Sequence, residues 1–410
     1  MLDSTLTRPG RRRIALLAAA GAVTAANVYL NQPLLGEAAR SFGVAPDVLG
    51  YVPTATQLGY AAGIALLVPA GDLRDRRRLI LALGAGSSLA LAAAAAAPTA
   101  LWLAVAGLVI GVLSPIPQLV APLAVALEKD LGTGRVVGLV QSGLLVGVLA
   151  SRTYAGALAS AAGWRWVFAV SAAGTALLTW VLRKALPRDA AAPAPERRTL
   201  GYRAALASLP GLFAHDRLVR RVTLSGLLVG VSFGAFWTVL TYLLDEHYHY
   251  GSTRIGLFGL VAAASALVSP SAGRLADRLG RRGALALPVC VVLAGWALLY
   301  PGGTGGTGPL ALVWLTAGVV VLDVGTWSQQ VVCQTSLFTR EPAVHSRLNT
   351  LYFALRFLGI AAGSLTGARL WAQGGWPAVC AAGAVAAALG LLVAVTPERT
   401  ARTPDTRCVT

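Results

Sequence analysis

Three charged side chains within long apolar stretches are the residues of this sequence with the clearest capacity for chemistry. They are Asp323, Arg152 and Arg356. A charge near the centre of a lipid bilayer costs at least ~2.5–3.5 kcal/mol, so it marks a functional site unless it belongs to a static ion pair. Desolvation raises the pKa of a carboxyl group and a nearby cation lowers it, so an arginine that moves relative to a carboxylate can load or release a proton. We therefore predict a proton-coupling group in which Asp323 binds the proton, Arg356 is its partner and Arg152 adds a third charge.

Polar and aromatic side chains recur in the same stretches at helical spacing. Asp323, Trp327 and Gln330 share one face of a helix, because steps of three and four return to the same side. Polar groups from several helices orient an organic substrate in a cavity, and aromatic rings supply contact area. For a single Asn or Gln, a hydrogen bond between two helices is the alternative explanation. The predicted substrate-binding residues are Asn27, Asn31, Gln57, Tyr60, Gln118, Gln141, Trp237, Tyr242, Trp327, Gln330, Asn349 and Tyr352.

These residues belong to a chain that is too apolar for a water-soluble enzyme. Of its 410 residues, 56% are hydrophobic and 12% are charged, whereas roughly a quarter are charged in soluble proteins. A bilayer core of ~30 Å takes about 20 apolar residues per helix. The sequence predicts twelve such spans, at about 14–35, 48–70, 79–97, 100–127, 136–158, 164–186, 219–244, 253–272, 283–301, 308–335, 346–371 and 375–396.

The excess of positive charge indicates orientation. The chain has 34 Lys and Arg against 17 Asp and Glu, which in a soluble protein would suggest a nucleic-acid partner. If the N-terminus is cytoplasmic, 28 of the 34 lie on the cytoplasmic side and four lie on or near the outer side, as the positive-inside rule requires. We therefore expect a multi-pass protein of a bacterial cytoplasmic membrane with both termini inside. Its basic loops contact anionic lipid, and no nucleic acid is expected to bind.

Cysteine and histidine give no sign of a cofactor or metal site. The four cysteines stand far apart with no CxxC pair, so neither a disulfide framework nor a metal site is indicated. His247 and His249 flank Tyr248 shortly after Asp245. This group could be interpreted as a metal cluster, but a solvated loop is the simpler interpretation. No cofactor is expected.

The longest break between spans divides them six and six. Residues 187–217 begin with a charged, Pro- and Ala-rich stretch that is typical of a linker. The segment from Thr199 to Phe213 is predicted to form a short amphipathic helix on the inner membrane surface. The predicted organisation is a six-helix bundle at 1–186, the linker at 187–217, a second six-helix bundle at 218–397 and a cytoplasmic tail at 398–410.

Two loops repeat each other at an offset of half the chain. GDLRDRRR follows the second span and GRLADRLGRR follows the eighth, and Gly71 and Gly273 are 202 residues apart, as are Asp75 and Asp277. Such a repeat indicates two copies of one six-helix unit. The residues of the two loops that we single out are Gly71, Asp75, Arg76, Gly273, Asp277, Arg278 and Arg281, and the resemblance described next implies a gating role for them.

At these loops the chain resembles the major facilitator superfamily, whose signature is G-x-x-x-D-R-x-G-R-R/K after the second and eighth helices. The loop at 273–282 fits every position of the signature, whereas the loop at 71–78 is two residues shorter. The resemblance implies an all-α integral membrane protein of twelve transmembrane helices in two pseudo-symmetric bundles. It also implies a central cavity lined by spans one, four, seven and ten, and loops that latch the inner gate. A topology signal with no gating role is the alternative for these loops.

Within that superfamily the drug:proton antiporters are the branch that the chain resembles most. ANVYLNQPLL in the first span and GWRWVF before the sixth are similar to bacterial efflux permeases, although Gly107 occupies the place of the fourth-helix arginine. The resemblance implies proton-coupled efflux of a small amphipathic drug or metabolite by alternating access, with the protein acting as a monomer. Uptake or exchange of an organic anion or sugar is the alternative, which the two interior arginines favour. A membrane enzyme is not expected, because no predicted span contains a histidine.

Overall fold

The computed structural model describes residues 8–73, 75–127, 133–186, 201–261, 280–341 and 344–396. Within these ranges every regular element is a helix, which confirms the predicted all-α class. Residues that fall outside them include Gly273, Asp277 and Arg278 of the second repeated loop.

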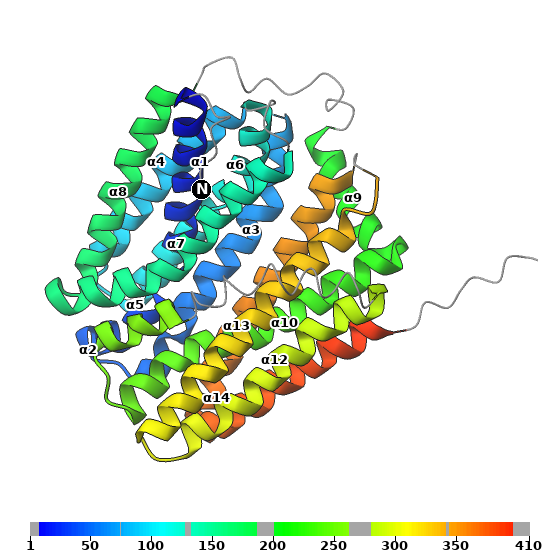
Figure 1. The fold of residues 1–410 in the computed structure, drawn as a ribbon. Helices are drawn as coiled ribbons and strands as arrows, with labels where there is room; N and C mark the ends of the chain where they lie inside the picture. Colours follow the sequence, from blue (N-terminus) through cyan, green and yellow to red (C-terminus); the bar gives the residue numbers. More distant parts are fainter. Residues whose placement is uncertain are drawn as a thin grey trace, which may run out of the picture.

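The first half of the chain forms one group of helices (Figure 1). Its elements are α1 (Arg8–Tyr29), the 3-10 turn η1 (Gln32–Leu34), α2 (Leu35–Phe42), the 3-10 turn η2 (Pro46–Gly50), α3 (Tyr51–Leu73), α4 (Arg76–Ala95), α5 (Ala100–Leu113), α6 (Ile116–Leu127), α7 (Thr133–Ala162) and α8 (Trp164–Ala185).

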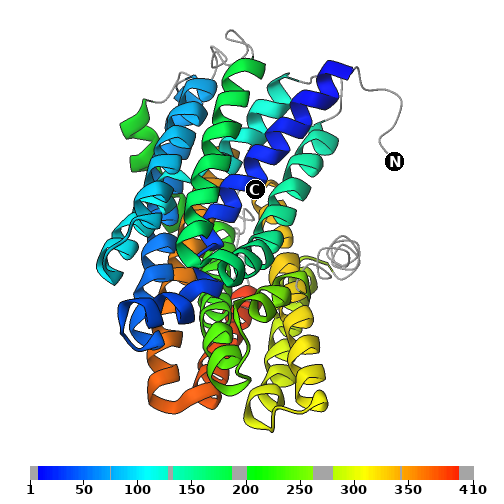
Figure 2. The same ribbon diagram turned by 90° about the vertical axis from the view of Figure 1, so that its left-hand side faces the viewer.

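The second half forms another group beside the first, and the same division is visible from the side (Figures 1 and 2). Its elements are α9 (Tyr202–His215), α10 (Arg217–Tyr242), the π-turn η4 (Leu243–His247), α12 (Gly280–Thr304), α13 (Pro309–Leu337) and α14 (His345–Val395).

The predicted spans are present in this arrangement. Among the described residues, nine helices are long and apolar enough to cross a membrane. One of them, α14, is two spans joined at a kink at Gly375, where φ is +59°. Together with α7 and the apolar helix Ser252–Val261, these helices account for the twelve spans.

The kink at Gly375 has a counterpart in the first bundle. Gly163, the residue before α8, has a φ of +94°, and Gly375 occupies the matching place before the last span. Glycine adopts positive φ without the steric cost that a Cβ imposes. A Gly-Trp pair therefore turns the chain into the final span of each bundle.

Two proline-containing breaks place side chains that matter for the site. α1 ends at Tyr29, and Pro33 lies in the turn that follows, so Gln32 stands at a bend rather than within a helix. The fourth predicted span is likewise divided, at Ser114 and Pro115, into α5 and α6. Gln118 lies in the first turn of α6, just after this break.

Large apolar side chains cover the outside of both bundles, as lipid-facing helices require. Many side chains of this kind are exposed, and the most exposed include Leu89, Leu101, Val313, Leu310 and Leu392. An apolar surface of this extent suits hydrocarbon and not water.

The helix predicted in the linker is found at Tyr202–His215 as α9, and it has no fully buried residue. It joins the two bundles, because Tyr202 donates a hydrogen bond to the carbonyl of Leu66 (2.9 Å) and Arg347 donates one to Ser208 (3.0 Å). The first part of the predicted linker (187–200) and the predicted tail, with the residue before it (397–410), lie outside the described residues. The domain boundaries themselves stay predictions.

Candidate functional site

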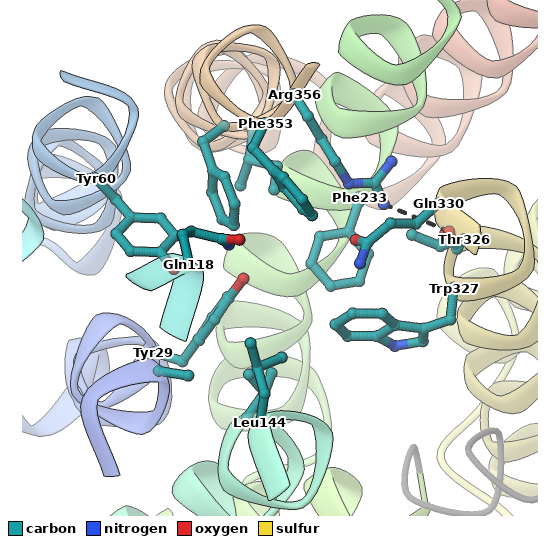
Figure 3. Close-up of a pocket in the computed structure, with 14 residues that line it drawn as sticks. Tyr29, Tyr60, Gln118, Leu144, Phe233, Thr326, Trp327, Gln330, Phe353 and Arg356 are labelled. Carbon is teal, nitrogen blue, oxygen red and sulfur yellow. Dashed lines mark hydrogen bonds between the residues drawn. The ribbon is translucent and has the colours of Figure 1, made fainter. Parts of the chain in front are cut away.

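A central cavity lies between the two bundles, with about 550 Å³ of empty space including the part that opens to solvent. In Figure 3, Tyr29, Tyr60 and Gln118 of the first bundle face Arg356 and Gln330 of the second across this space. The lining residues come from α1, α3, α6, α7, α10, α13 and α14, and they are Ala25, Tyr29, Tyr60, Gln118, Leu144, Val148, Phe233, Thr326, Trp327, Gln330, Phe353, Arg356, Phe357 and Ile360.

Aromatic rings form much of the cavity wall. The ring of Tyr60 meets that of Phe357 edge to face across the bundle interface, with centroids 4.4 Å apart. Phe233 and Trp327 also meet edge to face, at 6.5 Å. Such contacts hold the rings in place and leave flat apolar surface for a ligand.

Arg356 is the charged residue of this wall, and its described partners are neutral. Its Nη1 donates to Gln329 Oε1 (2.8 Å) and to the Tyr352 hydroxyl (3.3 Å), and its Nη2 donates to the carbonyl of Thr326 (3.4 Å). The side chain is 3% exposed. A guanidinium is therefore held rigidly at the cavity with no carboxylate beside it.

Asp323 and Arg152 form a second polar group, joined through Trp237. The Trp237 indole donates its N–H to Asp323 Oδ1 (3.2 Å), and the guanidinium carbon of Arg152 lies 3.7 Å from the centroid of the Trp237 ring. Arg152 also donates from Nε and Nη2 to Gln32 Oε1 (3.3 and 3.1 Å). Three helices, α7, α10 and α13, thus meet at one tryptophan.

The predicted pairing of Asp323 with Arg356 is not the arrangement in this structure. The hydrogen bonds of Arg356 are directed to Gln329 and Tyr352, whereas Asp323 interacts electrostatically with Arg152. No ion pair within 4.0 Å is formed by Asp323 in the described part of the chain. The two groups have different neutral partners: the indole N–H of Trp237 donates to Asp323, and Gln329 Oε1 accepts from Arg356.

Of the predicted substrate-binding residues, Tyr60, Gln118, Trp327 and Gln330 line the central cavity. Trp237 lines a smaller pocket instead, beside Gln32 and Arg152. Gln141 lies in α7, but its side chain is outside the described residues. Predicted residues that are buried away from the cavity are Gln57, Tyr242 and Tyr352.

Asparagines of the predicted set make hydrogen bonds between helices. Asn27 donates to Thr175 (3.1 Å), Asn31 donates to Thr56 (2.8 Å), and Asn349 accepts from Gln334 (3.1 Å). These contacts match the alternative that the sequence left open for single amides, which is a bond that fixes helix packing.

Several residues at the site were not predicted from the sequence. Tyr29, Phe233, Thr326 and Phe353 line the cavity, and Gln329 holds Arg356. The aromatic residues are inconspicuous in an apolar run, so their only signal is helical spacing, as with Phe353 four residues before Phe357.

Gly107, which stands where the resemblance would place an arginine, packs closely against α3. A Cβ at Gly107 would lie 2.6 Å from Thr56 Oγ1, and that hydroxyl accepts the hydrogen bond of Asn31. α3 and α5 therefore approach too closely for a side chain there.

Glu37 and Arg40 join the two bundles at the end where α2 lies, which we call the α2 end. Arg40 forms an ion pair with Asp245 (3.0 Å). Glu37 accepts hydrogen bonds from the backbone N–H of Trp164 in its own bundle (3.0 Å) and from the hydroxyl of Ser252 in the other (3.2 Å). These contacts link the bundles at the α2 end, and no sequence motif indicated these residues.

In the first repeated loop, Asp75 caps the helix that follows. This residue is the N-cap of α4, where its carboxylate accepts from the backbone N–H of Arg78 (3.2 Å). Arg77, which was not predicted, donates to the carbonyls of Leu186 and Arg183 at the end of α8 (3.0 and 2.8 Å). A Cβ at Gly71 would collide with Leu119 of α6.

The second repeated loop is largely outside the described residues. Gly273, Asp277 and Arg278 are among those left out, and Arg281 lies in α12 with its side chain undescribed. Their gating role, like that of Arg76, stays a prediction.

Comparisons with known proteins agree with the resemblance. A family model of the Major Facilitator Superfamily matches residues 17–364. The uncharacterized transporter YgaY of Escherichia coli O157:H7 is 35% identical over 381 residues, which are 93% of this chain and 94% of that protein. A protein of Streptomyces coelicolor described as a probable transporter, SCO4007, is 34% identical over 387 residues, 94% of this chain and 87% of that one.

A solved structure shares the fold. The nucleoside transporter NupG superposes with a TM-score of 0.71 at 13% sequence identity, covering 95% of this chain and 98% of NupG. At that identity the likeness concerns the fold alone.

Proposed function

The chain belongs to the major facilitator superfamily and is a multi-pass membrane transporter, and from that premise we propose that it exports a small amphipathic organic compound in exchange for protons. The transported compound occupies the central cavity, and the protein works by alternating access in a bacterial cytoplasmic membrane, as a monomer with both termini inside. The alternative function is uptake or exchange of an organic anion or sugar.

The cavity carries this proposal. It lies where the two bundles meet, and its wall combines aromatic rings with a few polar groups, which is the composition of sites for small organic ligands. Because residues from both bundles line it, a rigid-body movement of one bundle against the other would expose it first on one side of the membrane and then on the other.

The contacts at the α2 end support alternating access. The ion pair of Arg40 with Asp245 and the hydrogen bond of Ser252 with Glu37 link the bundles there. Near the other end, the described hydrogen bonds that connect the two bundles run through α9. In the predicted orientation the α2 end faces outward, so this conformation is closed to the outside. Its opening requires these contacts to break.

Proton coupling is assigned to Asp323. It is the carboxylate that the fold buries at mid-span among the described residues, 1% exposed. It accepts a hydrogen bond from Trp237, on whose ring Arg152 is stacked. Protonation of Asp323 removes the negative charge that Trp237 and Arg152 face. It therefore weakens the Trp237–Asp323 hydrogen bond, which links α10 to α13, and changes the balance between conformations.

The test uses the purified protein in liposomes with an imposed pH gradient. The probes are aromatic compounds of matched ring size with a sulfonate, a trimethylammonium or an alcohol group. The first two keep their charge at every pH, so the gradient cannot drive them through lipid in a neutral form. Gradient-driven movement of a probe by the protein, absent from empty liposomes, supports the proposal, and movement of none contradicts it.

A further inference from the structure

The charges around the central cavity identify the class of compound that it accepts. Of the described residues that line it, Arg356 alone carries a charge, and none is acidic. Asp323 is not part of the wall, and its Oδ1 is engaged by Trp237. A cationic substrate would meet a fixed positive charge at this wall and find no carboxylate to pair with.

Arg356 itself lacks a compensating anion. Its described partners are an amide oxygen, a hydroxyl and a backbone carbonyl, all neutral, and no carboxylate lies within ion-pair distance of it in the described part of the chain. A buried cation held by neutral groups keeps much of its desolvation cost, so a ligand that brings a negative charge is favoured there.

Further hydrogen-bond donors lie in the same wall. Thr326 is 1% exposed, and neither its hydroxyl nor the indole N–H of Trp327 has a hydrogen-bond partner within the part of the chain that the structure describes. The indole N–H is purely a donor. Both residues line the cavity, and Thr326 lies beside Arg356, whose Nη2 donates to its carbonyl (3.4 Å) (Figure 3). Donors without acceptors next to a guanidinium are the chemistry that an oxyanion satisfies.

The rest of the wall suits an apolar, flat body. Phe233, Phe353 and Phe357 also line the cavity, and the ring of Tyr60 packs against that of Phe357. Planar rings bury well against such surfaces.

We propose that the substrate is a small aromatic organic anion, such as an aryl carboxylate or sulfonate, whose oxyanion pairs with Arg356 while its ring lies among the phenylalanines. This inference rests on the proposed function, because it names the cargo of that cavity. The negative charge is that of the alternative cargo, an organic anion, which the two interior arginines favour in the sequence.

Calorimetric binding to the purified protein tests the substrate class without transport. The probes are benzene, naphthalene and indole compounds that carry a carboxylate, a sulfonate, a trimethylammonium or an alcohol group. We expect an anionic member to bind about ten- to a hundredfold more tightly than its neutral counterpart, as hydrogen bonds to charged groups allow, and the ammonium member to bind more weakly than the neutral one. Tighter binding of the ammonium member, or binding of no anion, would overturn the inference.

Three variants connect the preference to the residue. Arg356→Gln should remove the advantage of the anion over the alcohol, and Arg356→Lys should retain part of it. Arg165→Gln removes an arginine outside the cavity, which contacts Ser41 and the carbonyl of Ala97, and should leave all affinities unchanged. An anion preference that survives Arg356→Gln in protein that unfolds at the normal temperature also overturns the inference.

The outcomes separate this inference from the proposed function. If anions bind through Arg356 but no pH gradient drives their movement, the proton-coupled transport is wrong and the substrate class stands. If the gradient drives only ammonium compounds, transport stands and the substrate class is wrong.

Discussion

Trp237 donates its indole N–H to Asp323 (3.2 Å) while the guanidinium of Arg152 stacks on the face of the same ring, 3.7 Å from its centroid. One side chain on α10 therefore contacts both a buried anion on α13 and a buried cation on α7. Among the described residues neither charged group forms an ion pair within 4.0 Å. If Asp323 is the proton-coupling group that we propose, it would gain or lose its proton without breaking a salt bridge.

Trp237→Phe tests the indole directly. Phenylalanine keeps a ring for Arg152 and removes the N–H, a hydrogen bond to a charged group that contributes ~1.5–3 kcal/mol. We expect gradient-driven transport to fall while exchange of substrate across the membrane without a gradient persists. Liposome flux under both conditions measures this. Trp237→Leu also removes the cation–π contact and should lower the unfolding temperature further. Unchanged gradient-driven flux in the phenylalanine variant would contradict the link.

The contacts at the α2 end predict unequal effects of two substitutions. The Arg40 side chain is 61% exposed, so its ion pair contributes only ~0–1 kcal/mol and Arg40→Gln should change little. Glu37→Ala removes the acceptor for both Trp164 and Ser252 and should populate the conformation that is open at this end. Distances between spin labels on α2 and on the loop after α10 report the populations. Equal distance distributions for Glu37→Ala and the unchanged protein would exclude this role.

Gly107→Ala should destabilise the protein and should not improve coupling. The added Cβ would lie 2.6 Å from Thr56 Oγ1, and overpacking of this kind costs ~1–3 kcal/mol. The hydroxyl has little room to move, because it holds Asn31. Thermal unfolding in detergent measures the loss, and Gly174→Ala, where the new Cβ would meet open space, is the matched control. Equal unfolding temperatures for the two variants would show that α3 and α5 separate easily.

Substitutions of Asp75 distinguish its helix-capping role from a gating role. Asp75→Asn retains an oxygen that accepts from the N–H of Arg78, and it loses only an exposed ion pair worth ~0–1 kcal/mol. We expect normal stability and reduced transport if the repeated loop latches a gate, and the same for Asp277→Asn. Asp75→Ala also loses the N-cap, at ~0.5–2 kcal/mol. Full transport by both asparagine variants would leave these loops as topology signals.

The sequence predicted the spans well, because hydropathy acts locally. It did not predict the breaks after Tyr29 and at Ser114 and Pro115, which divide the first and fourth predicted spans. It predicted the contacts of individual side chains less well, because a helix buried on several sides meets a different neighbour on each face. Asn27 and Asn31 were assigned to the cavity, yet they bind Thr175 and Thr56. Gln330 was selected by its spacing from Asp323, whereas the adjacent Gln329, on another face of α13, is the residue that holds Arg356.

The charge partners were the least predictable part of the site. Arg356 was paired with Asp323 because both lie mid-span on consecutive helices. The partner of a buried charge depends on how each helix is rotated and on which neighbouring side chain reaches the charge. For Asp323 that side chain is Trp237. One sequence holds no information on either.

Gradient-driven flux by Asp323→Asn tests the central claim most directly. The amide keeps an oxygen that accepts from Trp237 and carries no titrating proton. In liposomes with a pH gradient, using a sulfonate, trimethylammonium or alcohol probe that the unchanged protein moves, we predict that the variant still exchanges the probe across the membrane but no longer accumulates it against a gradient. Full accumulation by Asp323→Asn would contradict the assignment of proton coupling to this carboxylate.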